Sequence, residues 1–170
     1  MPNPDPITFP KPIGFLVIPT LQLSSSAAPR GAPAGTRIPF LAMHYAVSRE
    51  QRGLDDRPTC VLGDVVITRS SDALSALFAS VCASGRCLSE VELSVSSRGP
   101  VAGEVQRLRL REVTVTGFQF VADPTNGSVN EVIRLRYGER EMSGYSLHED
   151  GTLSRSETAS WRAEAHELAV

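Results

Sequence analysis

The chain has 170 residues, a length that suits one domain with a single hydrophobic core. Hydrophobic residues make up 41% of the sequence and charged residues 21%, as in a soluble globular protein. The formal net charge is -2, so the chain as a whole has no electrostatic attraction to nucleic acid or to an anionic membrane surface.

The basic residues and the cysteines narrow the class of protein further. Of the 17 basic residues only Lys11 is a lysine, which fits either a bias in genome composition or planar pairing of arginines at interfaces.

Three cysteines are an odd number, which argues against a disulfide framework and for synthesis in a reducing compartment. Cys82 and Cys87 could meet across the end of a helix, but we expect them to pack as small hydrophobic residues. No histidine lies near either of them in the sequence, so a zinc site has no support.

Residues 1–12 are rich in proline and are expected to form an extended arm, because proline cannot donate a hydrogen bond to a strand. Residues 13–170 are expected to form one domain. The apolar run 13–23 loosely imitates a signal peptide, but Pro19 interrupts it and the proline-rich lead is unlike a charged leader. The run is also shorter than the ~20 residues that span a bilayer. We therefore expect neither a cleaved signal peptide nor stable membrane insertion.

The first part of the domain is predicted to hold short strands and loops. Residues 15–18 form an apolar strand, and residues 24–35 have the Ser, Ala, Pro and Gly content of a loop. Residues 37–47 have apolar side chains on both faces, which predicts a strand buried on both sides. Residues 48–63 are polar and longer than an ordinary connection, and such loops are often functional. The charged residues of this loop are Arg49, Glu50, Arg52, Asp55, Asp56 and Arg57.

A strand over residues 65–68 precedes a helix predicted over residues 72–84. Ser70 or Ser71 is expected to cap the first turn, because a hydroxyl can accept a hydrogen bond from an otherwise unpaired amide. Gly85 follows the last turn, where a left-handed residue commonly ends a helix. The apolar stripe that predicts the helix and its core contact consists of Leu74, Leu77, Phe78 and Val81.

The strands after the helix are predicted from alternation of apolar and polar residues over 88–95, 105–120 and 131–137. Apolar residues change parity within the second of these strands, which predicts a β-bulge near Arg111 and Glu112. Asn126 and Gly127 both tolerate positive φ and predict a tight turn before the third strand. The sequence therefore predicts a mainly β fold, an antiparallel β-barrel or two-sheet barrel with one short α-helix.

The carboxyl-terminal part gives a weaker pattern. Residues 148–151 are typical of a turn. Trp161, Ala163 and Ala165 alternate with charged residues, which favours a strand, although the Ala and Glu content also suits a helix.

Arginines are the most prominent candidate functional residues. Arg107, Arg109 and Arg111 share one face of a strand, and Arg134 and Arg136 share one face of the next. If the strands pair, these side chains form a basic patch that could contact a polyanion, cargo or partner protein. The alternative, which we favour, is a solvated face neutralised by glutamates such as Glu90, Glu92 and Glu131. No aromatic residues are interleaved with the arginines, so the sequence does not predict a nucleic-acid platform.

No catalytic, metal-binding or cofactor-binding pattern stands out, so we expect the protein not to be an enzyme. His44, His148 and His166 are scattered, and each is expected to be structural. The sequence has neither a glycine-rich phosphate loop nor a GxSxG motif. Pairs of carboxylates that meet only in space stay open from one sequence. A monomeric barrel that binds a small ligand is the alternative function, because barrels of this size can enclose one.

Several segments together resemble the haemolysin-coregulated protein (Hcp) family, the tube protein of bacterial type VI secretion. The segment VVITRSSDALSALFASVCASGRCLSEVELSV (65–95) resembles the family's strand, capped helix and following strand. The segments LRLREVTVTG (108–117) and EVIRLRYGEREMSGY (131–145) are similar to two later strands of the family. Further similarities lie at residues 15–19 and 41–48, at Asp150–Gly151 and at Trp161.

The resemblance implies a structural protein whose copies form hexameric rings that stack into a tube, with room in the lumen for effector proteins. It implies as partners further copies of the chain and the sheath, spike or effector proteins of the machine. It implies that residues 48–63 reach the adjacent ring, and that the arginine faces contact the lumen or a neighbouring subunit. Assembly would occur in the cytoplasm, followed by export without a cleaved signal peptide. A tube of another contractile injection machine is a close variant.

Overall fold

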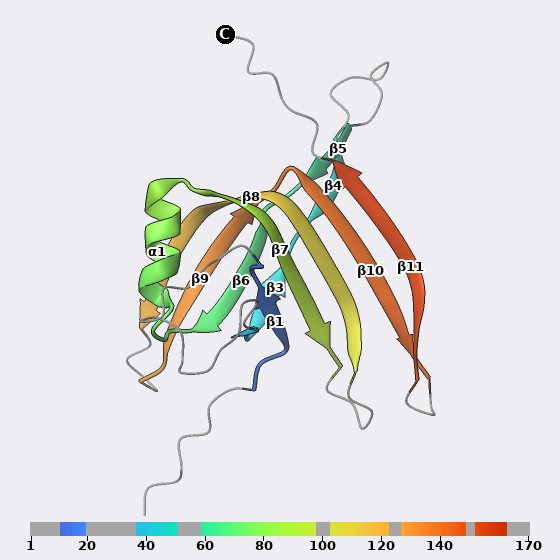
Figure 1. Cartoon of the computed structure of the whole chain (residues 1–170), viewed down its shortest axis with the longest axis horizontal. Helices are drawn as coiled ribbons and strands as arrows, with labels where there is room; N and C mark the ends of the chain where they lie inside the picture. Colours follow the sequence, from blue (N-terminus) through green and yellow to red (C-terminus); the bar gives the residue numbers. More distant parts are fainter. Residues whose placement is uncertain are drawn as a thin grey trace, which may run out of the picture.

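The computed structural model describes residues 11–19, 37–50, 59–97, 103–122, 127–148 and 152–162. These residues contain eleven strands and one α-helix, and every strand pairing among them is antiparallel (Figure 1). The strands are β1 (Gly14–Val17), β2 (Ile38–Phe40), β3 (Ala42–His44), β4 (Val47–Glu50), β5 (Thr59–Leu62), β6 (Val65–Ser70), β7 (Cys87–Ser96), β8 (Glu104–Ala122), β9 (Val129–Arg136), β10 (Glu139–Leu147) and β11 (Leu153–Arg162), and the helix is α1 (Ser75–Ser84). The predicted fold class, mainly β and antiparallel with one helix, is confirmed.

Nine strands form one sheet whose pairing order returns on itself. The order is β2-β1-β7-β8-β9-β6-β3, and β10 and β11 branch from β8. Only Leu41 separates β2 from β3, and its N–H donates to the carbonyl oxygen of Thr68 in β6 over 2.7 Å. The segment from β2 to β3 therefore pairs with β1 in its first half and with β6 in its second half.

The long strand β8 changes partners along its length. Its first part lies between β7 and β10, whereas its second part pairs with β9. The predicted switch of parity is confirmed, because Leu110 and Val113 are both buried while Arg111 and Glu112 are both exposed. Glu112 has φ of 54°, a left-handed conformation that redirects the following side chains. The pairing of β7 with β8 keeps one register across this point, so the switch comes from the conformation of Glu112 rather than from an inserted residue.

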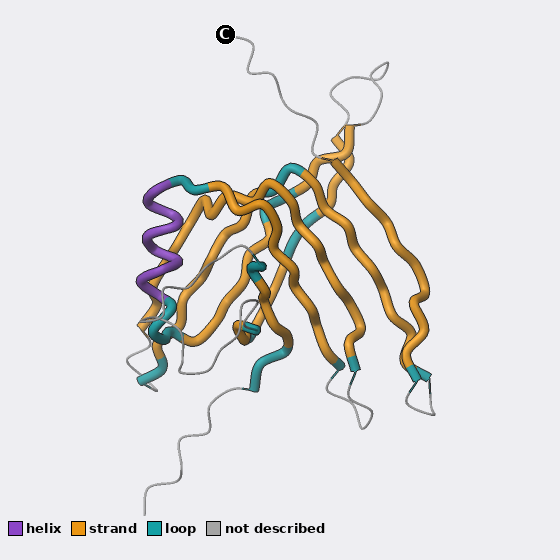
Figure 2. Tube along the Cα trace, in the orientation of Figure 1, coloured by secondary structure: helices purple, strands orange, loops and turns teal. Residues whose placement is uncertain are grey.

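Two hairpins extend the sheet. One is formed by β4 and β5, which continue β3 and β6 beyond Ala46, where the N–H of Gly63 donates to the Ala46 carbonyl over 3.0 Å. The other is formed by β10 and β11, which lie on the opposite side of the molecule from α1 (Figures 1 and 2). The carboxyl-terminal alternation around Trp161 therefore belongs to a strand, and Ala163 and Ala165 lie outside the described residues.

Helix α1 starts later than predicted. It begins at Ser75, and neither Ser70 nor Ser71 caps it. The preceding turn is instead organised by Asp72, whose Oδ1 accepts a hydrogen bond from the N–H of Leu74 over 2.8 Å. The predicted end is confirmed, because Gly85 has φ of 61° and caps the helix in the left-handed conformation.

The predicted apolar stripe of α1 is mostly in the core. Leu74, Phe78 and Val81 are buried, and Leu77 is half-buried against them. The rest of the core comes from inward residues of the strands, among them the fully buried Val91, Leu93, Leu108, Leu110 and Ile133.

Two further predictions need correction. Residues 37–47 do not form one strand buried on both sides; they are divided among three strands, and Ala42 and His44 are exposed. Leu41 shifts the parity, so Ile38 and Phe40 face the core while Met43 and Tyr45 are only half-buried. Residues 48–63 are not loop throughout, because 48–50 and 59–62 are paired in the hairpin of β4 and β5. The predicted loop 24–35, the arm up to residue 10 and Asn126 lie outside the described residues, whereas Gly127 has the expected positive φ of 67°.

Candidate interaction surfaces

The outer face of β7, β8, β10 and β11 carries rows of opposite charge, which we call the charge rows. The strand register places these rows directly beside one another: Glu90 and Glu139 both lie opposite Arg111, and Glu92 and Glu141 both lie opposite Arg109. Unlike charges on opposed positions of neighbouring strands attract each other. The sequence alone could not predict this arrangement, because it depends on which strands pair and in which register.

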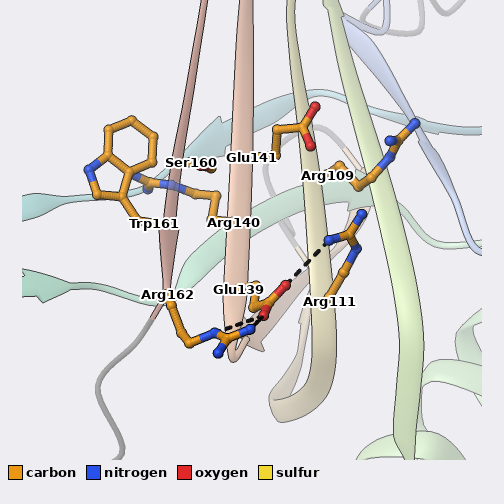
Figure 3. A pocket seen from close by; sticks show the side chains of 8 residues that line it. All are labelled: Arg109, Arg111, Glu139, Arg140, Glu141, Ser160, Trp161 and Arg162. Carbon is orange, nitrogen blue, oxygen red and sulfur yellow. Dashed lines mark hydrogen bonds and ion pairs between the residues drawn. The ribbon is translucent and has the colours of Figure 1, made fainter.

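Glu139 connects two of the rows. Its carboxylate accepts hydrogen bonds from Arg111 Nη1 over 3.3 Å and from Arg162 Nε over 2.8 Å (Figure 3). Hydrogen bonds from Arg162 and Arg111 lower the pKa of the Glu139 carboxyl. The three side chains line a groove of about 330 Å³, together with Arg109, Arg140, Glu141, Ser160 and Trp161. Four arginines and two glutamates line this groove, and the ion pairs of Glu139 with Arg111 and Arg162 neutralise part of its positive charge.

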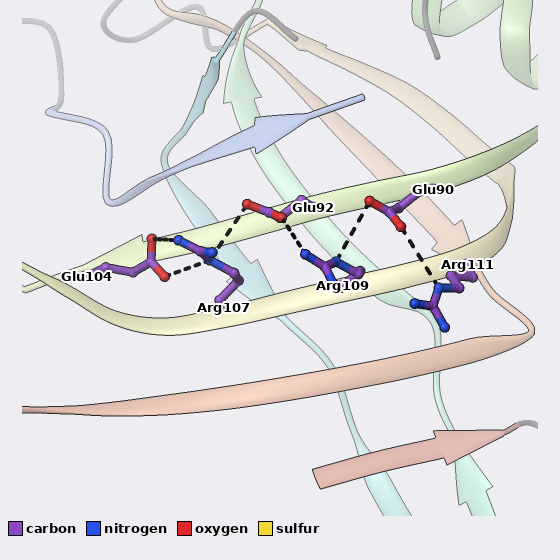
Figure 4. Close-up of polar contacts among 6 residues, drawn as sticks. All are labelled: Glu90, Glu92, Glu104, Arg107, Arg109 and Arg111. Carbon is purple, nitrogen blue, oxygen red and sulfur yellow. Dashed lines mark hydrogen bonds and ion pairs between the residues drawn. The ribbon is translucent and has the colours of Figure 1, made fainter. Parts of the chain in front are cut away.

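The arginines of β8 are also paired on their other side (Figure 4). Arg107 Nε donates to Glu104 Oε1 over 2.8 Å, and this hydrogen bond raises the pKa of the Arg107 guanidinium. Arg109 lies 3.6 Å from a carboxylate oxygen of Glu92, and Arg111 lies 3.9 Å from one of Glu90. The interpretation of a face neutralised by Glu90 and Glu92 therefore agrees with the positions of these side chains.

The two arginines of β9 are not opposite those of the charge rows. Arg136 is opposite Thr114 and lies 3.3 Å from Asp64, and Arg134 is opposite Gly117. A side chain at Gly117 would meet the Arg134 stem, which covers it at 3.0 Å. The predicted basic patch requires the arginines of β8 and β9 to lie opposite each other. The register of these strands does not place them so.

Glu131, which the sequence suggested as a partner for the arginine face, is instead completely buried. It pairs with Arg69, whose Nη1 donates to Glu131 Oε1 over 2.9 Å, and Arg69 also pairs with Asp72 before α1. Burial raises the pKa of the Glu131 carboxyl, and its polar neighbours only partly oppose that effect. A signal in the sequence existed: Arg69 shares the parity of the core residue Ile67, and Glu131 that of Ile133.

Little of the predicted ring-stacking loop is described. Arg49 lies in β4 and is exposed, and Glu50 is the last residue of that strand. Arg52, Asp55, Asp56 and Arg57 lie outside the described residues. The role assigned to this loop therefore stays a prediction.

Two features suited to protein contacts were not found from the sequence. Strand β11 pairs only with β10, so within the described chain its second edge is open. Phe120 and Val129 are exposed on one face where β8 ends and β9 begins, which we call the apolar tip, and Phe120 has 57% of its surface exposed. Open edges and exposed apolar clusters are typical of surfaces that a partner covers.

The residues considered for metal or disulfide chemistry do not come together. Cys60, Cys82 and Cys87 are free. Cys82 packs against the core as predicted, but the same prediction is wrong for Cys87, which is exposed. Within the described ranges, no three His, Cys, Asp or Glu side chains are grouped so as to hold a metal ion. The helix in those ranges is neither long nor apolar enough to cross a membrane.

The fold is that of type VI secretion proteins. It superimposes on a solved type VI secretion system protein with a TM-score of 0.70 and 15% identity, covering 88% of this chain and 95% of the other. A type VI secretion system effector from Yersinia pestis gives a TM-score of 0.62 at 14% identity, covering 88% and 99% of the two chains. The secreted protein Hcp3 from Pseudomonas aeruginosa gives 0.60 at 16% identity, covering 90% and 99%.

The sequence itself identifies the family within this class. Residues 35–143, more than half of the chain, match the family described as type VI secretion system effector, Hcp. The chain therefore belongs to the Hcp family of type VI secretion tube proteins. No curated protein matches it in sequence.

Proposed function

We propose that this protein is a subunit of a hexameric ring, that the rings stack into the tube of a type VI secretion apparatus, and that effectors can travel in the lumen. The observation that carries the proposal is the family match over residues 35–143, which extends from before β2 into β10. The role is structural rather than enzymatic. The ring would assemble in the cytoplasm and leave the cell without a cleaved signal peptide, in contact with sheath, spike or effector proteins.

The positions of the two uncovered features support a ring. A ring needs a heterologous contact, in which one surface of a copy meets a different surface of the next. The open edge of β11 and the apolar tip (Phe120 and Val129) are unlike surfaces on opposite sides of the subunit (Figure 1). We assign both to contacts between neighbouring copies, because such contacts would cover them without leaving a free surface in the closed ring.

The loop between β4 and β5 is assigned to contacts between stacked rings. Strands β4 and β5, which flank it in the sequence, lie on the far side of the molecule from the apolar tip (Figure 1). Asp55→Arg and Arg57→Glu reverse single charges in this loop, so they should leave rings intact and weaken stacking. Stacking that is unchanged in both variants would remove this role.

The alternative of a monomeric ligand-binding barrel has less support. Its interior would have to be hollow, whereas inward residues from opposite parts of the sheet, such as Leu93, Leu108 and Ile133, are completely buried in one core cluster. The groove of about 330 Å³ is lined mostly by charged side chains, four arginines and two glutamates, whereas small-ligand sites are mostly apolar.

The ring proposal can be tested at the apolar tip. Phe120→Asp places a charge on the large apolar side chain that is most exposed among the described residues, and Gln119→Asp places the same charge on the neighbouring exposed residue, whose side chain lies on the opposite face of β8. Removing a central aromatic contact weakens association roughly 30-fold or more. We expect Phe120→Asp to remain folded but to lose annular particles in negative-stain images, whereas Gln119→Asp should retain them. Equal ring formation by both variants would contradict the assignment of the tip to an interface.

A further inference from the structure

Among the side chains that the structure describes in the hairpin of β10 and β11, that of Arg140 carries the most deeply buried charge. Only 1% of its surface is exposed, and its position opposite Leu110 in β8 and Trp161 in β11 turns it toward the inside of the sheet. Figure 3 shows its guanidinium beside Trp161, away from Glu139 and Arg111 on the outer face. A buried guanidinium is costly unless anionic or hydrogen-bonding groups compensate its charge.

Three aromatic rings surround this guanidinium and form what we call the aromatic box. The Cζ of Arg140 lies 4.9 Å from the ring centre of Tyr45, 4.6 Å from that of Trp161 and 5.9 Å from that of Tyr137. Cation–π contacts of this kind stabilise the positive charge and fix the plane of the guanidinium. They do not provide acceptors for its N–H groups.

The hydrogen bonds of Arg140 use only one of its nitrogens. Nη1 donates to the hydroxyl of Tyr137 over 3.3 Å, and that hydroxyl donates in turn to the carbonyl of Gly63 over 3.1 Å. Nε and Nη2 are both buried and have no hydrogen-bond partner in the described parts of the chain. These two nitrogens present parallel N–H groups along one edge of the guanidinium, the edge that binds a carboxylate through two hydrogen bonds.

A comparison with Arg69 shows which kind of partner Arg140 lacks. Arg69 is buried to the same extent and its Nε also lacks a partner, but its two terminal nitrogens are paired with Glu131 and with Asp72. Among the described residues, no carboxylate lies within salt-bridge distance of Arg140. The groups that surround its charge are instead the three aromatic rings of the aromatic box.

We propose that the Nε and Nη2 edge of Arg140 is a binding site for a carboxylate. A carboxylate fits this edge because its two oxygens can accept from Nε and Nη2 together. Two sources are consistent with this chemistry. One is the chain's own Glu164 or Glu167, which follow Trp161 closely in the sequence, and the other is an acidic residue of a second copy. A carboxylate of the same copy would bind without ring assembly, whereas one from a second copy rests on the proposed association of copies.

The test compares two replacements of buried Arg140 with one of an exposed arginine. Arg140→Lys keeps a cation among the rings but removes the side-on pair of donors, and Arg140→Met removes the charge as well. Arg134→Lys makes the same conservative change at an exposed site and serves as the matched control. Unfolding in urea is followed by the fluorescence of Trp161, the only tryptophan in the chain and a wall of the aromatic box.

We expect Arg140→Lys to reduce the folding equilibrium constant about tenfold or more, since charge-assisted hydrogen bonds are lost. Arg140→Met should lose at least as much, and Arg134→Lys should change little. If the carboxylate comes from the same copy, the double replacement Glu164→Gln and Glu167→Gln will reduce stability. Adding Arg140→Lys to that variant will then reduce stability by less than it does in the unchanged protein. If the carboxylate comes from a second copy, Arg140→Lys will reduce stability only at protein concentrations at which copies associate.

Two results would overturn the proposal. One is an Arg140→Lys variant within about twofold of the unchanged protein, together with an Arg140→Met variant that is no less stable, because an unpaired buried charge can be replaced without loss. The other is a loss in Arg140→Lys that is independent of protein concentration and fully additive with the glutamate replacements. That outcome would mean that Arg140 contributes packing alone.

Discussion

Replacing Arg69 with methionine should leave Glu131 as an uncompensated buried carboxylate. Glu131 is completely buried and Arg69 is 1% exposed, and a hydrogen bond of 2.9 Å joins them. Removing one partner of such a pair costs about 3–5 kcal/mol. We expect a value near the lower end, about 3 kcal/mol at neutral pH, because a lone carboxyl can relieve part of the cost by binding a proton. For a chain of this size the loss corresponds to a melting temperature about 6–12 °C lower.

The pH dependence of this variant gives a second, independent check. Burial already raises the pKa of Glu131 above its ordinary 4.5, and loss of Arg69 removes an opposing charge. A carboxyl whose folded-state pKa is raised binds more protons in the folded state, so stability is greatest below the ordinary pKa. It then falls by up to about 1.4 kcal/mol per pH unit as the pH rises toward the raised value. Arg69→Met should therefore regain most of its stability at pH ~5.

The control is the double variant Arg69→Met with Glu131→Leu, in which neither buried charge remains. It should recover to within about 1 kcal/mol of the unchanged protein and lose the steep pH dependence. Asp72, the other partner of Arg69, is 46% exposed at its side chain and can be hydrated. Urea unfolding at several pH values, followed by circular dichroism, measures all three proteins. If the Arg69→Met protein is as stable at neutral pH as at mildly acidic pH, this reasoning is refuted.

Three further predictions concern the core and the charge rows. Gly14→Ala should destabilise the fold by about 1–3 kcal/mol in urea unfolding, because the added carbon would collide with the Ser94 carbonyl; unchanged stability would mean that β1 and β7 separate easily. Phe78→Asp should abolish folding as judged by circular dichroism, whereas Leu77→Asp, at a half-buried position of the same helix, should retain a cooperative transition. The pKa of Glu139 is lowered by hydrogen bonds from two arginines, so its contribution to stability is present above pH ~4.5 and is lost as the pH falls through the lowered pKa. Glu139→Gln should remove the loss of stability that comes from protonation of Glu139. If stability depends on pH in the same way in this variant and in the unchanged protein, the pairing of Glu139 with Arg111 and Arg162 is contradicted.

The elements that the sequence predicted well are those specified by local patterns. Strands β7, β8 and β9 alternate apolar and polar residues, and Gly85 ends the helix through its own left-handed conformation. The change of parity in β8 was also visible locally, although its cause is the backbone conformation of Glu112 rather than an extra residue.

The features that the sequence did not predict depend on partners distant in the chain. The pair of Arg69 and Glu131 forms only because β6 and β9 are neighbours in one register. The aromatic box joins Arg140 to Tyr45, from the other end of the domain. The hairpin of β10 and β11 lacks a regular apolar alternation, so its strands are stabilised by pairing with β8 and are not evident from periodicity.

The most direct test of the ring is the molar mass of the full-length protein in solution, measured by size-exclusion chromatography with light scattering over a wide range of concentrations. The account predicts a species of about 110 kDa, six copies of the 18.3 kDa chain, or stacks of that unit. A folded protein that stays at the mass of one chain at every concentration would contradict it.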